Sequence, residues 1–146
     1  MLGERDQMSL RAIPLIAIAF ILYNLLALVG INFNSAIFSV PMPSSRPPES
    51  IVKWVFTWGD LLIMVTLLML FIELLKSTYT STSSLVDHAL SMVLMIVCLI
   101  EFLLVKQAAT SVFFIILFAT VIDVIAGYTI GIRVAKRDVS FGGGDS

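Results

Sequence analysis

Four continuous apolar runs constrain the structure of this chain more than any other feature. They cover roughly residues 13–31, 59–75, 85–105 and 112–132. Each run is close to the length of about 20 residues that an α-helix needs to cross about 30 Å of hydrocarbon. Membrane β-barrels instead use alternating segments of about ten residues, and these runs do not alternate. The sequence therefore predicts an all-α, polytopic membrane protein with four transmembrane helices in an antiparallel bundle.

Composition supports the membrane class. The 146 residues are 59% hydrophobic and only 13% charged, and the mean hydropathy is +1.04. A soluble domain of this size has too little interior to bury so many apolar side chains. The net charge of -1 and the scattering of the nine Lys and Arg residues argue against a nucleic-acid partner. The lipid bilayer is the expected surrounding, and the single cysteine, Cys98, excludes an internal disulfide.

The chain divides into three predicted parts. Residues 1–12 form an N-terminal segment, residues 13–132 form the transmembrane domain, and residues 133–146 form a flexible tail because they have no apolar face to bury. The first apolar run is longer than the core of a secretory signal, and no small-residue cleavage site follows it. We therefore expect this run to be retained as a spanning helix.

The basic residues predict the orientation, because Lys and Arg are more frequent in cytoplasmic loops. Three of them lie on the side of the first and third loops, namely Arg46, Lys53 and Lys106. Six lie on the side of the two termini, namely Arg5, Arg11, Lys76, Arg133, Lys136 and Arg137. Both termini are therefore predicted to be cytoplasmic.

The first loop, residues 32–58, is the only long connection. It contains four prolines, which disfavour a helix and favour an extended, stiff excursion on the outer side: Pro41, Pro43, Pro47 and Pro48. Trp54 and Trp58 precede the second run and are typical of anchors at the membrane interface. Two interpretations stay open for the loop, a recognition surface or a simple connection between helices.

Several titratable residues lie at the ends of the runs, where structural roles explain them. Glu73 and Lys76 have the spacing of an ion pair on one helix face. Asp60 and Asp87 fit the first turns of the second and third helices, where a carboxylate meets the positive end of the helix dipole. His88 stands alone, and a lone histidine is weak support for a metal site. We predict neither a metal nor another cofactor.

Asp123 lies in the middle of the fourth run, on the same helix face as three small residues: Ala119, Gly127 and Gly131. A surface of small residues at this spacing lets another helix approach closely. We therefore predict that this face is a helix–helix interface, and that the protein forms a homo-oligomer or joins a larger membrane complex through it.

An ionised carboxylate in hydrocarbon costs at least a few kcal/mol, and every Lys and Arg falls at the end of a run. Asp123 therefore needs an explanation at its depth. Three are open: a protonated carboxyl that donates a hydrogen bond across an interface, a site for a transported proton or cation, or a pair with a base on another subunit. Glu73, Glu101 and Asp123 form a candidate proton or ion relay.

Sequence motifs for catalysis are lacking. The chain contains no GxSxG, HExxH or CxxC motif and no glycine-rich phosphate loop followed by a helix. We therefore expect a protein that is not an enzyme.

The portion from about Gly59 to Ile132 contains FIELLK at the end of the second run, a short polar turn after it, and two further runs that end in a basic tail. In these features it resembles the phosphate-starvation-inducible E family of small four-helix membrane proteins. The resemblance covers about half of the chain, and it implies a location in the bacterial inner membrane and no known biochemical activity. The sequence departs from the family in its Pro-rich first loop and in Asp123.

Two function classes follow. The first is a structural or accessory subunit that oligomerises or docks to a membrane complex through the face of Ala119, Asp123, Gly127 and Gly131. The alternative is a proton- or cation-coupled transporter, or a small oligomeric channel, that uses the intramembrane carboxylates.

Overall fold

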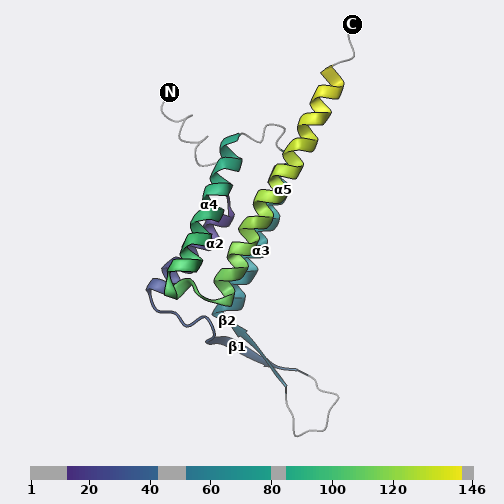
Figure 1. Cartoon of the computed structure of the whole chain (residues 1–146). Coiled ribbons are helices and arrows are strands. Elements are labelled where there is room, and N and C mark those ends of the chain that lie inside the picture. The colour runs from purple at the N-terminus through teal and green to yellow at the C-terminus, as the bar shows by residue number, and fades with distance from the viewer. Residues whose placement is uncertain (1–12, 43–51, 80–84, 143–146) are drawn as a thin grey trace, which may run out of the picture.

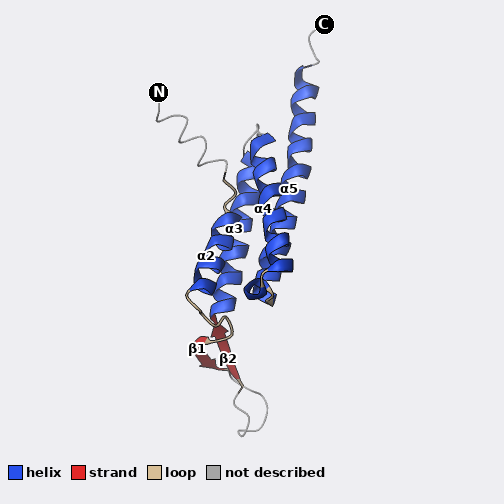
Figure 2. Ribbon diagram, turned by 60° about the vertical axis from the view of Figure 1, so that its left-hand side comes forward, coloured by secondary structure: helices blue, strands red, loops and turns tan. Residues whose placement is uncertain are grey.

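The computed structural model describes residues 13–42, 52–79 and 85–142. Within these ranges the chain forms a helical bundle with a β-hairpin at one end (Figures 1 and 2). The elements are α2 (Ile16–Leu28), β1 (Ala36–Pro41), β2 (Lys53–Thr57), α3 (Trp58–Tyr79), α4 (Leu85–Leu104), the 3-10 turn η1 (Lys106–Ala108) and α5 (Ser111–Gly142). Helices that follow one another along the chain run in opposite directions (Figure 1).

Three helices are long and apolar enough to cross a membrane, as an integral membrane protein requires. They are Trp58–Tyr79, Val86–Leu104 and Ser111–Arg133, with hydropathy values between 2.0 and 2.2. These segments match the second, third and fourth predicted spans to within a few residues. The membrane class and the helical bundle are therefore confirmed.

The predicted first span, residues 13–31, is shorter in the structure. Helix α2 has 13 residues and is about 20 Å long, less than the roughly 30 Å of hydrocarbon. Its end is fixed by Gly30, which has a φ of +82°. The N–H of Gly30 bonds to the carbonyl of Ala27, and that of Ile31 to the carbonyl of Leu26, the pattern of a Schellman cap. The structure thus does not confirm four spans.

The C-terminal prediction also needs correction. Residues 133–142 belong to α5, so the expected flexible tail is helical up to Gly142. No proline interrupts this helix, and extending an existing helix costs far less than starting a new one.

The all-α prediction misses the β-hairpin formed by β1 and β2. The strands pair in an antiparallel register, with Phe38 opposite Phe56 and Val40 opposite Trp54. The extended conformation predicted for the first loop is confirmed for these strands, whereas Pro43, Pro47 and Pro48 lie outside the described residues. Aromatic and β-branched side chains favour strands when they can pack across a pair, and the rings of Phe38 and Phe56 stack at 5.0 Å.

The hairpin joins α3 without a linker. The N–H and the hydroxyl of Thr57 both donate to Asp60 Oδ2, at 2.8 and 2.7 Å, and the N–H of Asp60 donates to Thr57 Oγ1 at 3.2 Å. This reciprocal arrangement is a capping box. It confirms the first-turn role predicted for Asp60 and fixes the direction in which β2 enters the helix.

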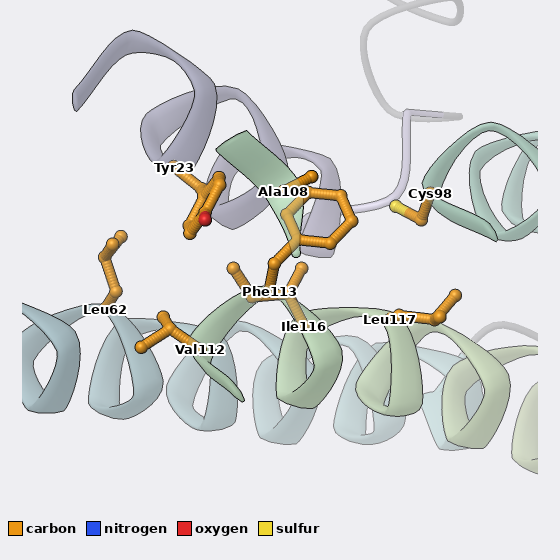
Figure 3. Close-up of a cluster of buried hydrophobic side chains, with 8 residues drawn as sticks. All are labelled: Tyr23, Leu62, Cys98, Ala108, Val112, Phe113, Ile116 and Leu117. Carbon is orange, nitrogen blue, oxygen red and sulfur yellow. The ribbon is translucent and has the colours of Figure 1, made fainter. Parts of the chain in front are cut away.

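One of two clusters of buried apolar side chains lies toward the hairpin end of the bundle, and Figure 3 shows its members. Its buried members come from α2, α3, α4, η1 and α5: Tyr23, Leu62, Cys98, Ala108, Val112, Phe113, Ile116 and Leu117. The Tyr23 ring lies against Phe33 and Phe113, at centroid distances of 4.6 and 4.9 Å. Its hydroxyl donates to the carbonyl of Gln107 at 2.8 Å and lies 2.7 Å from Thr110 Oγ1. Tyr23 therefore ties α2 to the start of α5.

Helices α3 and α5 form the most extensive pair, α4 packs on α5, and α2 packs on α3 and α5. Gly59 allows the close contact of α3 with α5, because a Cβ there would lie 2.9 Å from Val112 Cγ2. Helix α4 is the least covered of the three long helices, with 11% of its apolar window buried against 28% for α3 and 33% for α5.

Candidate functional site

A small polar cavity lies between α3, α4 and α5. Its volume is about 30 Å³. Among the described residues, Asp123 and four other titratable side chains line it. The lining residues are Glu73, Lys76, Ser77, Asp87, His88, Ser91, Asp123 and Gly127. We call it the polar cavity.

Asp123 is the most deeply placed charged group in the cavity, with 4% of its surface exposed. The hydroxyl of Ser91 on α4 hydrogen-bonds to its carboxyl group. Lys76 and His88 lie near enough to attract the carboxylate, and Glu73 lies near enough to repel it. Asp123 is therefore held in a preformed polar setting contributed by two neighbouring helices.

This setting corrects the expectation that the chain itself has no basic side chain for Asp123. Lys76 falls near the end of α3, as the sequence indicated. A lysine, however, has a long flexible stem that can carry its ammonium group well away from its own Cα. The α3–α5 packing brings Lys76 and Asp123 to the same cavity, so the counter-charge does not require another subunit.

The carboxylate of Glu73 interacts with two groups, a backbone N–H and an ammonium group. Its Oε2 accepts the backbone N–H of Leu15 at 2.9 Å, and its Oε1 lies 3.6 Å from Lys76 Nζ. The predicted Glu73–Lys76 ion pair is confirmed. The bond to Leu15 was not predicted, and it satisfies one of the N–H groups that the start of α2 leaves without a helical partner.

His88 lies against the backbone of α5. A Cβ on Gly127 would lie 3.1 Å from His88 Cε1 and 3.6 Å from Nδ1, and the His88 and Tyr128 rings meet edge-on at 6.2 Å. The small residue at position 127 therefore makes room for the imidazole ring beside the cavity.

The predicted small-residue face thus faces its own chain. Ala119, 3% exposed, packs with Ile16 of α2 and Leu70 of α3. Asp123 and Gly127 line the polar cavity, and Gly131, one turn further, is half-buried. At Ala119, Asp123 and Gly127 this face meets other helices of its own chain, whereas the sequence predicted a contact with another chain.

Glu101 does not line the polar cavity. It lies ten residues after Ser91 on α4, which places it about 15 Å further along the helix axis. Its Oε2 accepts a 3.4 Å hydrogen bond from Asn24 Nδ2 of α2. Of the predicted relay, the structure brings Glu73 and Asp123 together and leaves Glu101 apart.

The remaining predicted positions have simpler settings. Trp54 is exposed on β2, and Trp58 is the first residue of α3. Asp87 lies in the first turn of α4, as predicted, and also lines the polar cavity. No group of three or more His, Cys, Asp or Glu side chains suited to a metal ion occurs among the described residues.

The cavity volume limits the chemistry. A space of about 30 Å³ holds one or two water molecules, since a single water needs about 10–15 Å³ on this measure. The site can therefore accommodate a proton with its water, or a small dehydrated ion, and not an organic substrate.

No protein-family model, curated protein or solved structure matches the chain. Function is therefore inferred from the polar cavity and its surroundings.

The sequence placed Asp123 in the middle of the fourth apolar run, but it did not indicate which groups surround this residue. Ser91 and His88 lie three residues apart on α4, and this spacing places them on one helix face. Asp87 lies beside this face, and this group of polar residues on one helix was the sequence signal that could have placed Ser91 and His88 near Asp123.

Proposed function

We propose that this chain is a non-enzymatic membrane protein that conducts protons, with Asp123 as the group that takes up and releases them. The main support for this proposal is that Asp123 is buried in a cavity also lined by Glu73, Lys76 and His88. Ionisable residues at membrane depth that face a bundle interior typically mark proton or ion pathways.

The charges around Asp123 favour a proton over a metal cation. Lys76 shares the cavity with Asp123 and pairs with Glu73, so part of the negative charge that a metal cation would require is already compensated. A proton can instead be shared among carboxyl, imidazole and hydroxyl groups, which all donate and accept hydrogen bonds in one of their protonation states.

His88 and Asp87 line the polar cavity together with Asp123, and Asp87 lies in the first turn of α4; the proposed route of the proton runs from Asp123 past His88 to Asp87. This end of α4 is the cytoplasmic one under the orientation predicted from the basic residues. To complete a crossing, α4 shifts against α5 and opens the other side. It is the least buried of the three long helices, and so has the fewest contacts to break. The location proposed for the protein is the inner membrane of a bacterium.

Reconstitution tests the proposal. Purified protein is placed in liposomes that contain a pH-sensitive dye, and a potassium gradient with valinomycin drives proton entry. We expect the wild-type protein to acidify the vesicles and Asp123→Asn to lose nearly all of this flux, because an amide cannot exchange the proton.

The controls use the same acid-to-amide change elsewhere. Asp60→Asn and Glu101→Gln alter carboxylates outside the polar cavity and should keep the flux. Equal flux in Asp123→Asn and wild type would reject the proposal. Wild-type vesicles that take up sodium but no protons would reject it as well.

A second candidate function is that of an accessory subunit or homo-oligomer, and the β-hairpin favours it. One hairpin face carries five exposed apolar side chains, namely Phe38, Val40, Met42, Val52 and Trp54. An isolated two-stranded hairpin is marginally stable in water, and apolar patches of this kind often mark protein contacts. A protein partner on the hairpin side would cover the face.

Native mass spectrometry after gentle extraction from the source membrane tests this second function. A stable oligomer or a stoichiometric partner is expected, and Phe38→Ser with Trp54→Ser should release it. The matched control is Met64→Ser, which alters an exposed apolar residue of α3. A chain that is monomeric and free of other polypeptides would exclude the accessory role.

A further inference from the structure

A lateral groove between α2 and α4 forms a second cavity, separate from the polar cavity. Its volume is about 430 Å³, and it is lined by Asn24, Val97, Ile100, Glu101, Leu104 and Val105. The groove exists because α2 packs on α3 and α5 whereas α4 packs on α5. The two helices therefore leave a gap on the side of the bundle.

The walls of the lateral groove are apolar and continue into the lipid-facing surface. Ile100 and Leu104 are 50% and 79% exposed, and in a membrane such exposed apolar side chains contact acyl chains. The volume of the groove falls in the range of about 300–1,000 Å³ typical of sites for small organic ligands. A ligand can thus enter sideways from the bilayer.

Among the described residues that line the lateral groove, Glu101 alone is charged. Its one recorded hydrogen bond, from Asn24 Nδ2, is long at 3.4 Å. Asn24 Nδ2 also donates to its own helix, to the carbonyl of Phe20 at 3.2 Å. Among the described residues no basic side chain forms an ion pair with Glu101. The carboxyl therefore has acceptor capacity left for a ligand.

We propose that the lateral groove binds amphiphilic organic cations, with Glu101 as the counter-charge and the apolar walls as the seat for the ligand body. Charge complementarity selects the cation, since a buried or half-buried carboxylate disfavours anions and gains little from neutral ligands. The apolar walls select a ligand that partitions into membranes. The inference is independent of the proton path, because Glu101 does not line the polar cavity.

Binding of tetraphenylphosphonium to the full chain in detergent tests the inference by isothermal titration calorimetry. This probe is a permanent cation with an apolar body and no proton to exchange. We expect saturable binding by the wild type, weakened about tenfold or more in Glu101→Gln, which corresponds to about 1.4 kcal/mol. Asp123→Asn should bind like the wild type even if its proton flux is lost.

Three further measurements keep the result interpretable. Ile100→Trp fills the lateral groove without changing its charge and should abolish binding, which decides the matter if Glu101→Gln does not fold. Triphenylphosphine oxide, a neutral analogue, should not bind saturably. Asp60→Asn is the matched carboxylate control and should keep the wild-type affinity.

Three outcomes would overturn the inference. The first is equal affinity of Glu101→Gln and wild type for the cation. The second is equally tight binding of the neutral analogue. The third is a wild-type protein that is oligomeric and does not bind the cation, together with an Ile100→Trp variant that is monomeric. That result would show that a second copy of the chain occupies the groove.

Discussion

The backbone N–H of Leu15 donates a 2.9 Å hydrogen bond to Oε2 of Glu73. The residue before α2 is thereby joined to a side chain in the last third of α3. Because Glu73 also pairs with Lys76 and lines the polar cavity, the attachment of α2 and the arrangement of the candidate site depend on the same carboxylate.

Replacing Glu73 should therefore loosen α2. In Glu73→Ala the Leu15 N–H loses its acceptor in a partly buried position, which costs about 1–3 kcal/mol. We expect a clear fall in melting temperature in detergent by scanning fluorimetry. Glu73→Gln keeps a side-chain oxygen that can accept the Leu15 N–H, so its melting temperature should fall less than that of Glu73→Ala. Equal melting temperatures of Glu73→Ala and Glu73→Gln would show that the hydrogen bond to Leu15 has no stabilising role.

Tyr23→Phe should destabilise the hairpin end of the bundle. The hydroxyl of Tyr23 bonds to Gln107 and Thr110, and its loss leaves these groups without that partner at a cost of about 1–3 kcal/mol. The measurement is thermal unfolding, with Tyr128→Phe as control because Tyr128 is 63% exposed. Equal melting temperatures for Tyr23→Phe and wild type would show that water replaces the lost contacts.

Gly59→Ala should be poorly tolerated. The added methyl group would meet Val112 Cγ2 at 2.9 Å and the Phe33 carbonyl at 3.0 Å, and overpacking of this kind typically costs about 1–3 kcal/mol. The control is Gly127→Ala, whose methyl group meets the end of the His88 side chain at 3.1 Å, because a side chain can turn aside. Thermal unfolding compares the two, and a larger loss for Gly127→Ala would contradict the packing described at Gly59.

Gly127→Leu separates an internal role of the small-residue face from an external one. A leucine would displace His88 from the polar cavity, so we expect reduced proton flux with an unchanged oligomeric state by light scattering. Ser77→Ala alters another cavity residue without adding bulk and serves as control. Dissociation of an oligomer by Gly127→Leu would instead show that the face contacts another chain.

The sequence predicted the three helices that are long and apolar enough to cross a membrane. Their continuous apolar runs match α3, α4 and the spanning part of α5 within a few residues, because the bilayer thickness sets the length of an apolar helix. Predictions from short sequence patterns were also correct where the interacting residues are close together in the sequence. Asp60 caps α3, and Glu73 pairs with Lys76 three residues away.

Predictions failed where a local pattern competes with a cap or with strand pairing. The first apolar run continues past the end of α2, but Gly30 takes a left-handed conformation and closes the helix. The hairpin depends on pairing between residues such as Val40 and Trp54, which lie on either side of the proline-rich segment. Neither outcome follows from hydropathy.

The sequence by itself determined that the chain carries long apolar helices suited to a membrane, where three of them lie, and at which point along each helix the carboxylates fall. Helix rise and periodicity carry this information. Only the tertiary structure decided that Asp123 hydrogen-bonds to Ser91 and shares a cavity with His88 and Lys76, whereas Glu101 meets Asn24. Periodicity gives the face of a helix but not the neighbour that packs against it, and the reach of a long side chain such as Lys76 can bring a residue from a helix end to a buried charge.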